Sequence, residues 1–596
     1  MAAKDFYIKQ TEQLEAQQKN LLKKKNNFAW LRLANILSIF AALYFLSPVG
    51  WLYSTTAAIL LIVCFIQLLY RDIANKEAIA HTAQLLRINK AELDALEHQY
   101  FQFDGGSQHI PKEHFYANDM DIFGHASLFQ LFNRTVSEMG SWQLAQWLLK
   151  PATATEIPLR QEAVKELSQK INWAQHLQAH GKENAIRIDT KDRLQFWLNE
   201  PATYSRFVHW QWLRYVLPII SISITIGTIL GLFPMNVFYS TMLLMTLIAL
   251  PQEKKIGNLH NRLSKMVDEL DTLSQSIATI EKENFNSPLL KELQQQFKQE
   301  HTTASQKIQA LKKILDRLDV RFNIVLVFPL NLLFLWNLQQ MLQLEKWKKE
   351  NATGVGHWFD ALGIYEALIS FAVIHFNNPD WVFPTLTTEH FSIEANNLGH
   401  PLLAENKRVN NFIKIDHKAS IMLVTGSNMA GKSTYLRSTG INVILAMAGA
   451  PVCAGYFTMS PVQLISSMRI SDNLEESTST FYAELKKLKT VIDKVNNKEK
   501  VFILLDEILR GTNSLDRHTG SEALIKQLIK QDAVAILATH DVDLAALQTN
   551  FTQNIFNYHF DVQVNNEELY FDYKLKPGVC TSLNASILMK KIGIEI

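Results

Sequence analysis

The sequence predicts an α/β domain with a phosphate-binding loop in the C-terminal part of the chain, preceded by an all-α region that contains two transmembrane helical hairpins. Three observations predict this fold class. A glycine-rich loop, Gly426-x-x-x-x-Gly431-Lys432-Ser433, stands between a short apolar run and a helical segment. From about residue 380, apolar runs of strand length alternate with helical sequence, as in a sheet covered by helices. Earlier in the chain, paired apolar runs approach the roughly 20 residues that cross a bilayer.

Length and charge narrow the class of protein. The chain has 596 residues, so about two to four domains are expected. Its formal net charge is only +2, so any nucleic-acid binding must depend on a local basic surface. The three cysteines, Cys64, Cys453 and Cys580, are far apart and lack metal-ligand spacing, which favours a reducing compartment without disulfides. No cleavable signal peptide is expected, because a long polar segment precedes the first apolar run.

Residues 1–27 are predicted to form a polar N-terminal helix, and residues 28–72 a first transmembrane hairpin. The apolar runs Trp30 to Leu46 and Trp51 to Tyr70 have aromatic residues near their ends, as at membrane interfaces. Basic residues flank the pair, which by the positive-inside rule places both outer ends in the cytoplasm: Lys23, Lys24, Lys25, Arg71 and Lys76. The alternative is a buried helical hairpin in a soluble core. The run lengths favour the membrane.

Residues 205–252 repeat this pattern and predict a second transmembrane hairpin. Tyr215 to Phe233 and Met235 to Leu250 are largely apolar, and Pro234 begins the turn between them. Arg214 and Lys254 lie outside the runs, so both ends again face the cytoplasm. A buried helical pair is again the alternative, and the short second run makes this hairpin the weaker of the two patterns.

Residues 73–204 and 253–384 are predicted to be two parts of one helical core region. Residues 255–320 have the charge mixture of long helical arms, with apolar seams for packing at Leu259, Leu263, Met266 and Leu270 and at Leu311, Ile314 and Leu318. Phe322 to Leu338 is apolar, but a fifth span would place the two halves of the protein on opposite sides of the membrane. We therefore expect a buried or hairpin-associated helix there, and a core helix at residues 355–376.

Residues 385–596 are predicted to form the α/β domain. Its candidate strands are apolar throughout rather than alternating, with helical sequence between them: Ser420–Val424, Val501–Leu505 and Ala533–Ala538. Continuous apolar strands are typical of a parallel sheet that is covered on both faces.

The loop after the first strand contains the residue types that hold nucleotide phosphates. Glycines let backbone N–H groups turn inward around phosphate oxygens. The Lys432 ammonium can reach the β- and γ-phosphates, the Ser433 hydroxyl can ligate Mg²⁺, and the following helix N-terminus attracts the same anion. A chance glycine-rich turn is the alternative, which the order of strand, loop, Lys-Ser and helix disfavours. The predicted ligands are ATP and Mg²⁺, and the predicted nucleotide-binding residues are Gly426, Ser427, Asn428, Met429, Ala430, Gly431, Lys432, Ser433 and Thr434.

Two acids and a histidine end the next strands. Asp506 follows an apolar strand and is placed to hold Mg²⁺ together with Ser433. Glu507 is placed to polarise the attacking water as a general base. A strand ending in two acids is weak evidence alone but strong beside the phosphate-binding loop. His540 ends the third strand; the pattern favours a γ-phosphate contact over a structural capping role.

These segments together resemble the MutS family of DNA mismatch-repair ATPases, which belongs to the ABC-type ATPase group. Thr425 to Arg437 is similar to the family's nucleotide loop, and Asp472 to Leu485, with Ser479-Thr480-Phe481, to its signature segment. Asp506 to Asn513 resembles the second nucleotide motif, and Ala538-Thr539-His540 the switch. The resemblance identifies residues 385–596 as a MutS-like ATPase domain. More weakly, residues 115–200 resemble the start of the family's lever domain.

The resemblance implies a homodimer with composite ATP sites. In this family the signature serine of one subunit contacts the γ-phosphate bound by the other. Ser479 would then act in trans in catalysis, while Asn428 would contact phosphate or the bound water in cis. A plain helix N-cap at residues 477–480 is the alternative, and both roles can coexist because a capped helix N-terminus also attracts anions.

The sequence also departs from the family pattern. The first predicted membrane hairpin occupies the place of the mismatch-reading domain, and the DNA clamp is expected to be either shortened or replaced by the second hairpin. Ser477-Thr478 replaces a Gly-Arg pair, and Arg408 stands near the position of the adenine-stacking aromatic residue. Because the sequence ends at Ile596, the C-terminal helices that strengthen the family's dimer are not expected. Mismatch specificity is therefore in doubt, whereas ATP binding is not.

Three functions are compatible with these features. The first is a MutS-like ATPase, anchored in the inner or plasma membrane and facing the cytoplasm, that dimerises with ATP and handles DNA mismatches or structures. The second is an ABC-like membrane ATPase for transport or signalling, which the lack of a charged intramembrane pathway disfavours. The third is a nucleotide-gated scaffold for a protein partner. Salt-dependent DNA binding would separate the first from the others.

Overall fold

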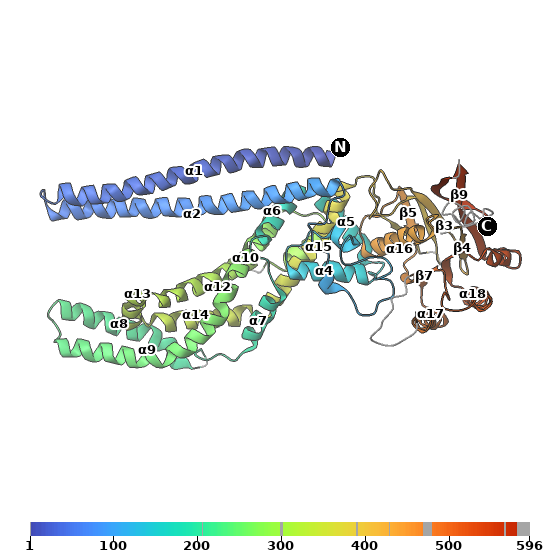
Figure 1. Ribbon diagram of the computed structural model, residues 1–596. Coiled ribbons are helices and arrows are strands. Elements are labelled where there is room, and N and C mark those ends of the chain that lie inside the picture. Colours follow the sequence, from blue (N-terminus) through green and yellow to red (C-terminus); the bar gives the residue numbers. More distant parts are fainter. Residues whose placement is uncertain are drawn as a thin grey trace.

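The computed structural model describes residues 2–205, 207–298, 302–388, 391–427, 429–468, 480–565 and 568–580. Figure 1 shows an elongated molecule with the α/β domain at one end. Helices form the middle of the molecule, and two helical projections extend from it to the end opposite the α/β domain. The mostly helical N-terminal part and the mixed α/β C-terminal part agree with the two predicted regions.

The first projection consists of two long, continuous helices, α1 (Ala2–Leu46) and α2 (Trp51–Leu96). The predicted polar N-terminal helix and the first apolar run are thus one helix, and the second apolar run continues without a break into the polar sequence after it. The half of the hairpin near its turn exposes large apolar side chains, including Trp30 at 71% and Trp51 at 77% exposure. The polar half packs on the helical core. The two halves therefore have different surroundings.

The second projection contains α8 (Val208–Ile229), α9 (Met235–Leu263) and α13 (Ile324–Phe334). Helix α13 packs against both α8 and α9, so the predicted association of this segment with the hairpin is confirmed. The predicted single helix from Phe322 to Leu338 is wrong, because Leu335 has a left-handed φ of 51°. The chain bends there by 75° before α14 (Trp336–Asn351). The alternative prediction, that this segment is buried, is also wrong, because Val325 of α13 is 76% exposed.

Four helices in the described ranges are long and apolar enough to cross a membrane, and up to six spans result if each of two bent helix pairs is one span. The four are α1, α2, the segment His209–Ile229 of α8, and α15 (Val355–Asn377). In α15, 78% of the apolar window is buried inside the protein, against 6% to 11% in the other three. Helix α15 is therefore a core helix, as predicted for residues 355–376.

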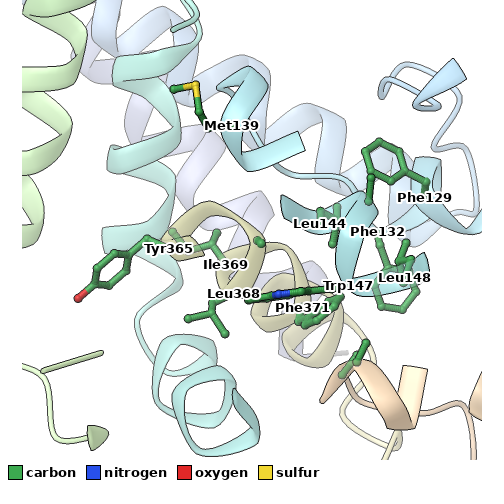
Figure 2. Close-up of a cluster of buried hydrophobic side chains, with 14 of the residues drawn as sticks. Phe129, Phe132, Met139, Leu144, Trp147, Leu148, Tyr365, Leu368, Ile369 and Phe371 are labelled. Atoms are coloured by element: carbon green, nitrogen blue, oxygen red, sulfur yellow. The ribbon is translucent and has the colours of Figure 1, made fainter. Parts of the chain in front are cut away.

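The helical core surrounds α15. Figure 2 shows Trp147 and Leu148 beside Phe371, and Phe132 nearby. The predicted apolar seams are buried at Leu263, Met266 and Leu270 and at Leu311, Ile314 and Leu318. The other helices of this region are α3 Leu128–Phe132, α4 Glu138–Leu149, α5 Glu156–Ser168, α6 Ile171–Gly181, α7 Ile188–Asn199, α10 Val267–Lys282, α11 Pro288–Gln295 and α12 Ala304–Asp319.

The α/β domain contains a six-stranded sheet in the order β10-β9-β4-β8-β7-β6. All neighbours are parallel except β9 and β10. The predicted strands are confirmed within one residue as β4, β7 and β8. The strand bounds are β4 Ile421–Thr425, β6 Gln463–Ser467, β7 Val501–Asp506, β8 Val534–Thr539, β9 Ile555–Asn565 and β10 Glu568–Pro577. A smaller sheet, not predicted, has the order β1-β5-β2-β3, with β1 Thr385–Leu386, β2 Ile393–Leu398, β3 Asn411–Ile415 and β5 Tyr456–Met459.

Helices cover both faces of the larger sheet. Met422 and Val424 of β4 lie in one apolar cluster with residues of α16 (Lys432–Ala448). Ile421 and Leu423 lie in a second cluster with residues of α17 (Thr480–Asn496) and α18 (Ser514–Lys530). Helix α16 also contacts the helical core, because the Arg160 guanidinium donates a hydrogen bond of 3.1 Å to the Ala448 carbonyl. The helix after the phosphate-binding loop is thus directly connected to the helical region.

Candidate nucleotide site

The glycine-rich loop connects β4 to α16 and needs its two outer glycines. Gly426 has a φ of 148° and Gly431 a φ of 106°, both in the region that side chains disfavour. A Cβ atom on Gly426 would also approach the Phe560 carbonyl oxygen to 2.9 Å. Between these glycines Met429 is 80% exposed, and Asn428 lies outside the described residues. The backbone therefore adopts a curved loop immediately before the N-terminus of α16, as predicted.

The Lys432 side chain lies within this loop. Its ammonium donates hydrogen bonds of 2.8 Å to the Gly426 carbonyl and 3.0 Å to the Ser427 carbonyl. Burial lowers the pKa of Lys432, while the nearby carboxylates of Glu507 and Asp506 act in the opposite direction. A buried cation whose hydrogen bonds go to neutral carbonyl groups is well placed to accept an anionic ligand.

Asp506 lies beside Ser433, as expected for two ligands of one Mg²⁺ ion. Burial raises the pKa of Asp506, and a hydrogen bond from the Ser433 side chain partly opposes this rise. One carboxylate oxygen, Oδ1, is buried and has no hydrogen-bond partner among the described residues. Such an oxygen fits a hard cation that prefers oxygen ligands. No group of three or more His, Cys, Asp or Glu in the described ranges could hold a metal ion, so phosphate and water oxygens would have to complete the shell.

Glu507 and His540 form a pair at the same sheet edge. Glu507 has a left-handed φ of 50°, and its carboxylate is paired with the His540 imidazole and with the Arg510 guanidinium, the latter at 3.2 Å. The hydrogen bond from His540 is the largest cause that lowers the pKa of Glu507. His540 Nδ1 also lies 3.0 Å from the Gly426 carbonyl and 3.4 Å from Lys432 Nζ. The structure thus brings the predicted base, switch histidine and loop lysine together.

A pocket of about 430 Å³ lies in front of the loop. The predicted site residues that line it are Ser427, Met429, Gly431, Lys432, Ser433, Thr434 and Glu507. Sequence reasoning missed two aromatic residues at its wall, Phe560 of β9 and Tyr573 of β10, as well as His400, Lys407 and Asn411. Arg408, proposed for adenine stacking, is not among the lining residues; its side chain lies against Gly399 instead.

The signature segment falls outside the described residues, which resume at residue 480, so the structure does not place Ser479. Helix α17, which follows it, contacts the nucleotide site through Glu484. The Glu484 carboxylate accepts hydrogen bonds from the backbone N–H groups of Leu509 and Arg510, directly after Glu507. The signature helix and the loop after Glu507 are therefore one connected unit.

The fold and the site define a helical protein with an α/β domain in which a glycine-rich loop, a buried lysine and two acids meet at one sheet edge. The chain belongs to the MutS family: the model of MutS domain III matches residues 112–324, and that of MutS domain V residues 422–590. The second match contains the glycine-rich loop, Asp506, Glu507 and His540.

Three relatives agree with this assignment. The chain is 33% identical over 227 residues to the DNA mismatch repair protein MutS of Methanosarcina mazei, which covers 37% of this chain and 25% of the relative. It is 32% identical over 225 residues to MutS of Carboxydothermus hydrogenoformans, covering 37% and 26%. It is 30% identical over 235 residues to MutS protein homolog 4 of Mus musculus, covering 38% and 24%. The chain thus matches about a quarter of the length of these relatives.

Proposed function

We propose that this protein is an ABC-type ATPase of the MutS family that binds and hydrolyses Mg²⁺-ATP. The observation that carries the proposal is that Lys432, Ser433 and Glu507 line one pocket at the edge of the parallel sheet, with Asp506 hydrogen-bonded to Ser433. A purified preparation should release phosphate from ATP, and Lys432→Ala should abolish both ATP binding and phosphate release. Equal release by the variant and the wild type would refute the proposal.

Each residue of the site has a separate role in ATP hydrolysis. Lys432 turns from the Gly426 and Ser427 carbonyls to the β- and γ-phosphates and neutralises part of their charge. Ser433 and Asp506 would hold Mg²⁺, which when bound would stabilise negative charge on the phosphate oxygens. Glu507 leaves His540 to accept a proton from the attacking water. His540 then hydrogen-bonds the γ-phosphate.

The dimer is part of the proposal, because a single loop leaves one side of the γ-phosphate open. Ser479 of one subunit would complete the site of the other through the N-terminal end of α17. Ser479→Ala should weaken ATP-driven dimerisation, measured by sedimentation with and without ATP. Hydrolysis by a strict monomer would refute the trans site.

The proposed partner is DNA, and the proposed role is in mismatch repair or in the handling of DNA structures. The MutS matches at residues 112–324 and 422–590 support this assignment. Binding of purified protein to homoduplex, mismatched and branched DNA over a salt series tests it, since phosphate contacts make affinity fall linearly with salt on logarithmic axes. Absence of salt-dependent binding would favour the second candidate, an ABC-like membrane ATPase with a protein partner or a transport or signalling role. The exposed apolar hairpins are the observation that favours this candidate.

We further propose that both hairpins anchor the protein in the inner or plasma membrane, with the nucleotide site facing the cytoplasm. Both projections point away from the α/β domain toward the same end of the molecule (Figure 1), and their outer halves expose large apolar side chains. Exposed apolar surface on this scale is unstable in water. The protein should stay in the membrane fraction after alkaline carbonate washing. Its release by carbonate would refute the anchor.

A further inference from the structure

The first hairpin carries a local excess of positive charge. Between Glu15 and Asp72 the sequence contains six basic residues and no acidic one. They are Lys19, Lys23, Lys24, Lys25, Arg32 and Arg71. The protein as a whole has a net charge of only +2, so this excess is a local feature that the nucleotide site does not explain.

The folded hairpin gathers these charges at one level. The Asn75 side chain of α2 donates a hydrogen bond of 3.1 Å to the Leu21 carbonyl of α1, which fixes how the two helices lie beside each other. Arg71 on α2 thereby lies near the level of the three lysines on α1. We call Lys19, Lys23, Lys24, Lys25 and Arg71 the basic collar. All five are exposed, and within the described part of the chain none forms an ion pair.

Arg32 behaves differently from the collar. Its guanidinium pairs at 3.0 Å with Asp72, whose side chain is fully buried and also lies 3.4 Å from the Lys76 ammonium. Side chains on a helix lean toward its N-terminus, so Arg32 leans from the apolar half toward the collar. This arrangement keeps the one charged group of the apolar half of α1 near the polar level.

The exposed apolar surface begins next to the collar. Lys25 and Trp30 are five residues apart on one helix, an axial separation of about 7.5 Å. Trp30 is 71% and Tyr70 70% exposed at this transition, as amphipathic aromatic side chains are at the boundary between lipid headgroups and acyl chains. Along the hairpin, the basic collar is followed by exposed aromatic and then aliphatic side chains. A lipid leaflet has the matching order of charged headgroups, interface and acyl chains.

We infer that the basic collar binds the phosphate headgroups of anionic phospholipids and gives the membrane anchor a preference for them. The inference rests on the proposed membrane anchoring. A nucleic acid would also supply phosphates, but it would not cover the apolar and aromatic surface next to the collar. Juxtamembrane lysines and arginines each contribute to binding at an anionic surface, and salt screens this contribution.

Lipid selectivity of the reconstituted full chain tests the inference. The protein is placed in phosphatidylcholine vesicles with trace spin-labelled phosphatidylglycerol or phosphatidylcholine, and the motionally restricted fraction of each label is measured. We expect severalfold selectivity for phosphatidylglycerol at low salt and a marked loss of selectivity at 1 M salt, where the screening length is about 3 Å. The triple variant Lys23→Gln, Lys24→Gln, Lys25→Gln should lose most of this selectivity.

A charge-matched control is available in the α/β domain. The exposed residues Lys489, Lys500 and Lys530 lie far from the hairpin in sequence and form no ion pair within the described residues. Their triple substitution by Gln removes the same charge and should leave lipid selectivity unchanged. Equal restriction of both labels in the wild type would overturn the inference. So would a collar variant that keeps lipid selectivity and loses DNA binding. Failure of the wild type to enter any vesicle would instead refute the membrane anchor itself.

Discussion

The carboxylate of Glu484 on α17 accepts a hydrogen bond from the backbone N–H of Leu509. A second bond, 3.2 Å long, comes from the N–H of Arg510. Glu484 is buried, and burial raises its pKa, whereas the two backbone donors act in the opposite direction. Leu509 and Glu507 both have left-handed φ angles, of 60° and 50°, which non-glycine residues adopt only at a cost of about 1–3 kcal/mol each. Glu484 therefore stabilises the backbone that orients Glu507.

Replacing Glu484 should disturb catalysis more than ATP binding. Glu484→Ala removes both acceptors, and hydrogen bonds to a charged group are worth about 1.5–3 kcal/mol. We expect kcat to fall about tenfold or more with little change in KM, because Glu484 does not line the pocket. Glu484→Gln keeps one acceptor oxygen and should retain more activity. Steady-state kinetics of both variants provides the measurement; an unchanged kcat in Glu484→Ala would contradict the positioning role.

Glu507→Gln tests the proposed base directly. The amide keeps the size of the side chain and cannot accept the proton, so ATP binding should persist while kcat falls about 100-fold or more. Nucleotide affinity and single-turnover hydrolysis separate the two effects. Arg510→Gln is a useful companion, because it breaks the 3.2 Å ion pair with Glu507 without removing the base. Normal hydrolysis by Glu507→Gln would exclude the assigned role.

The pair between Glu507 and His540 predicts a pH effect. The hydrogen bond from His540 lowers the pKa of Glu507, and burial opposes this shift. A lowered pKa keeps the carboxylate ionised, and thus active as a base, to a lower pH than an ordinary glutamate allows. In His540→Ala the largest lowering cause is lost while burial remains, so the acid limb of the kcat/KM profile, which reports the free enzyme, should move to higher pH.

A histidine outside the pocket serves as the control for this shift. His518 pairs with Asp541 at 2.6 Å and does not line the pocket, so His518→Ala should leave the acid limb in place. Profiles of kcat/KM between about pH 4 and 9 provide the comparison. An acid limb at the same pH in the wild type and His540→Ala would show that the pair does not control the base.

Much of the nucleotide site could be predicted from the sequence because its signals are local. A glycine-rich loop before Lys432 and an acid pair at the end of an apolar strand are patterns within a few residues. Their convergence follows from the parallel sheet, in which carboxyl ends of strands meet at one edge. Phe560 and Tyr573 could not be found this way. They reach the pocket because β9 pairs with β4 across more than a hundred residues of sequence.

In the helical region, too, only local features could be predicted from the sequence. Periodicity predicted the buried seams around Leu270 and Leu318 because each repeats over a short stretch of helical sequence, although the first seam passes from α9 through the turn Ser264–Met266 into α10. It did not predict the bend at Leu335, since a left-handed leucine leaves no signal comparable to glycine or asparagine. Nor did composition show that the polar and apolar parts of α1 are one helix, because a continuous helix can pass from one environment to another without a breaking residue.

The junction between the first hairpin and the helical core contains a buried ion pair. Glu92 near the end of α2 pairs with Arg134, and its Oε2 accepts hydrogen bonds of 3.0 Å from Arg134 and 2.9 Å from the Asn377 amide of α15. Both ionic side chains are almost fully buried. Because water cannot replace a lost partner at such a site, the pair should be important for keeping the hairpin attached.

Glu92→Ala should therefore destabilise the protein by about 3–5 kcal/mol, because it leaves the Arg134 charge buried and unpaired. The double variant Glu92→Leu, Arg134→Met removes both charges and should recover most of that loss, since apolar replacement of a buried pair is often nearly neutral. Lys4→Ala, which breaks an exposed pair with Glu97 in the same hairpin, should change stability by less than about 1 kcal/mol. Urea denaturation in detergent ranks the three variants. If Glu92→Ala were as stable as Lys4→Ala, the Arg134 charge would have to reach water when Glu92 is absent. The junction would then open without unfolding of the core.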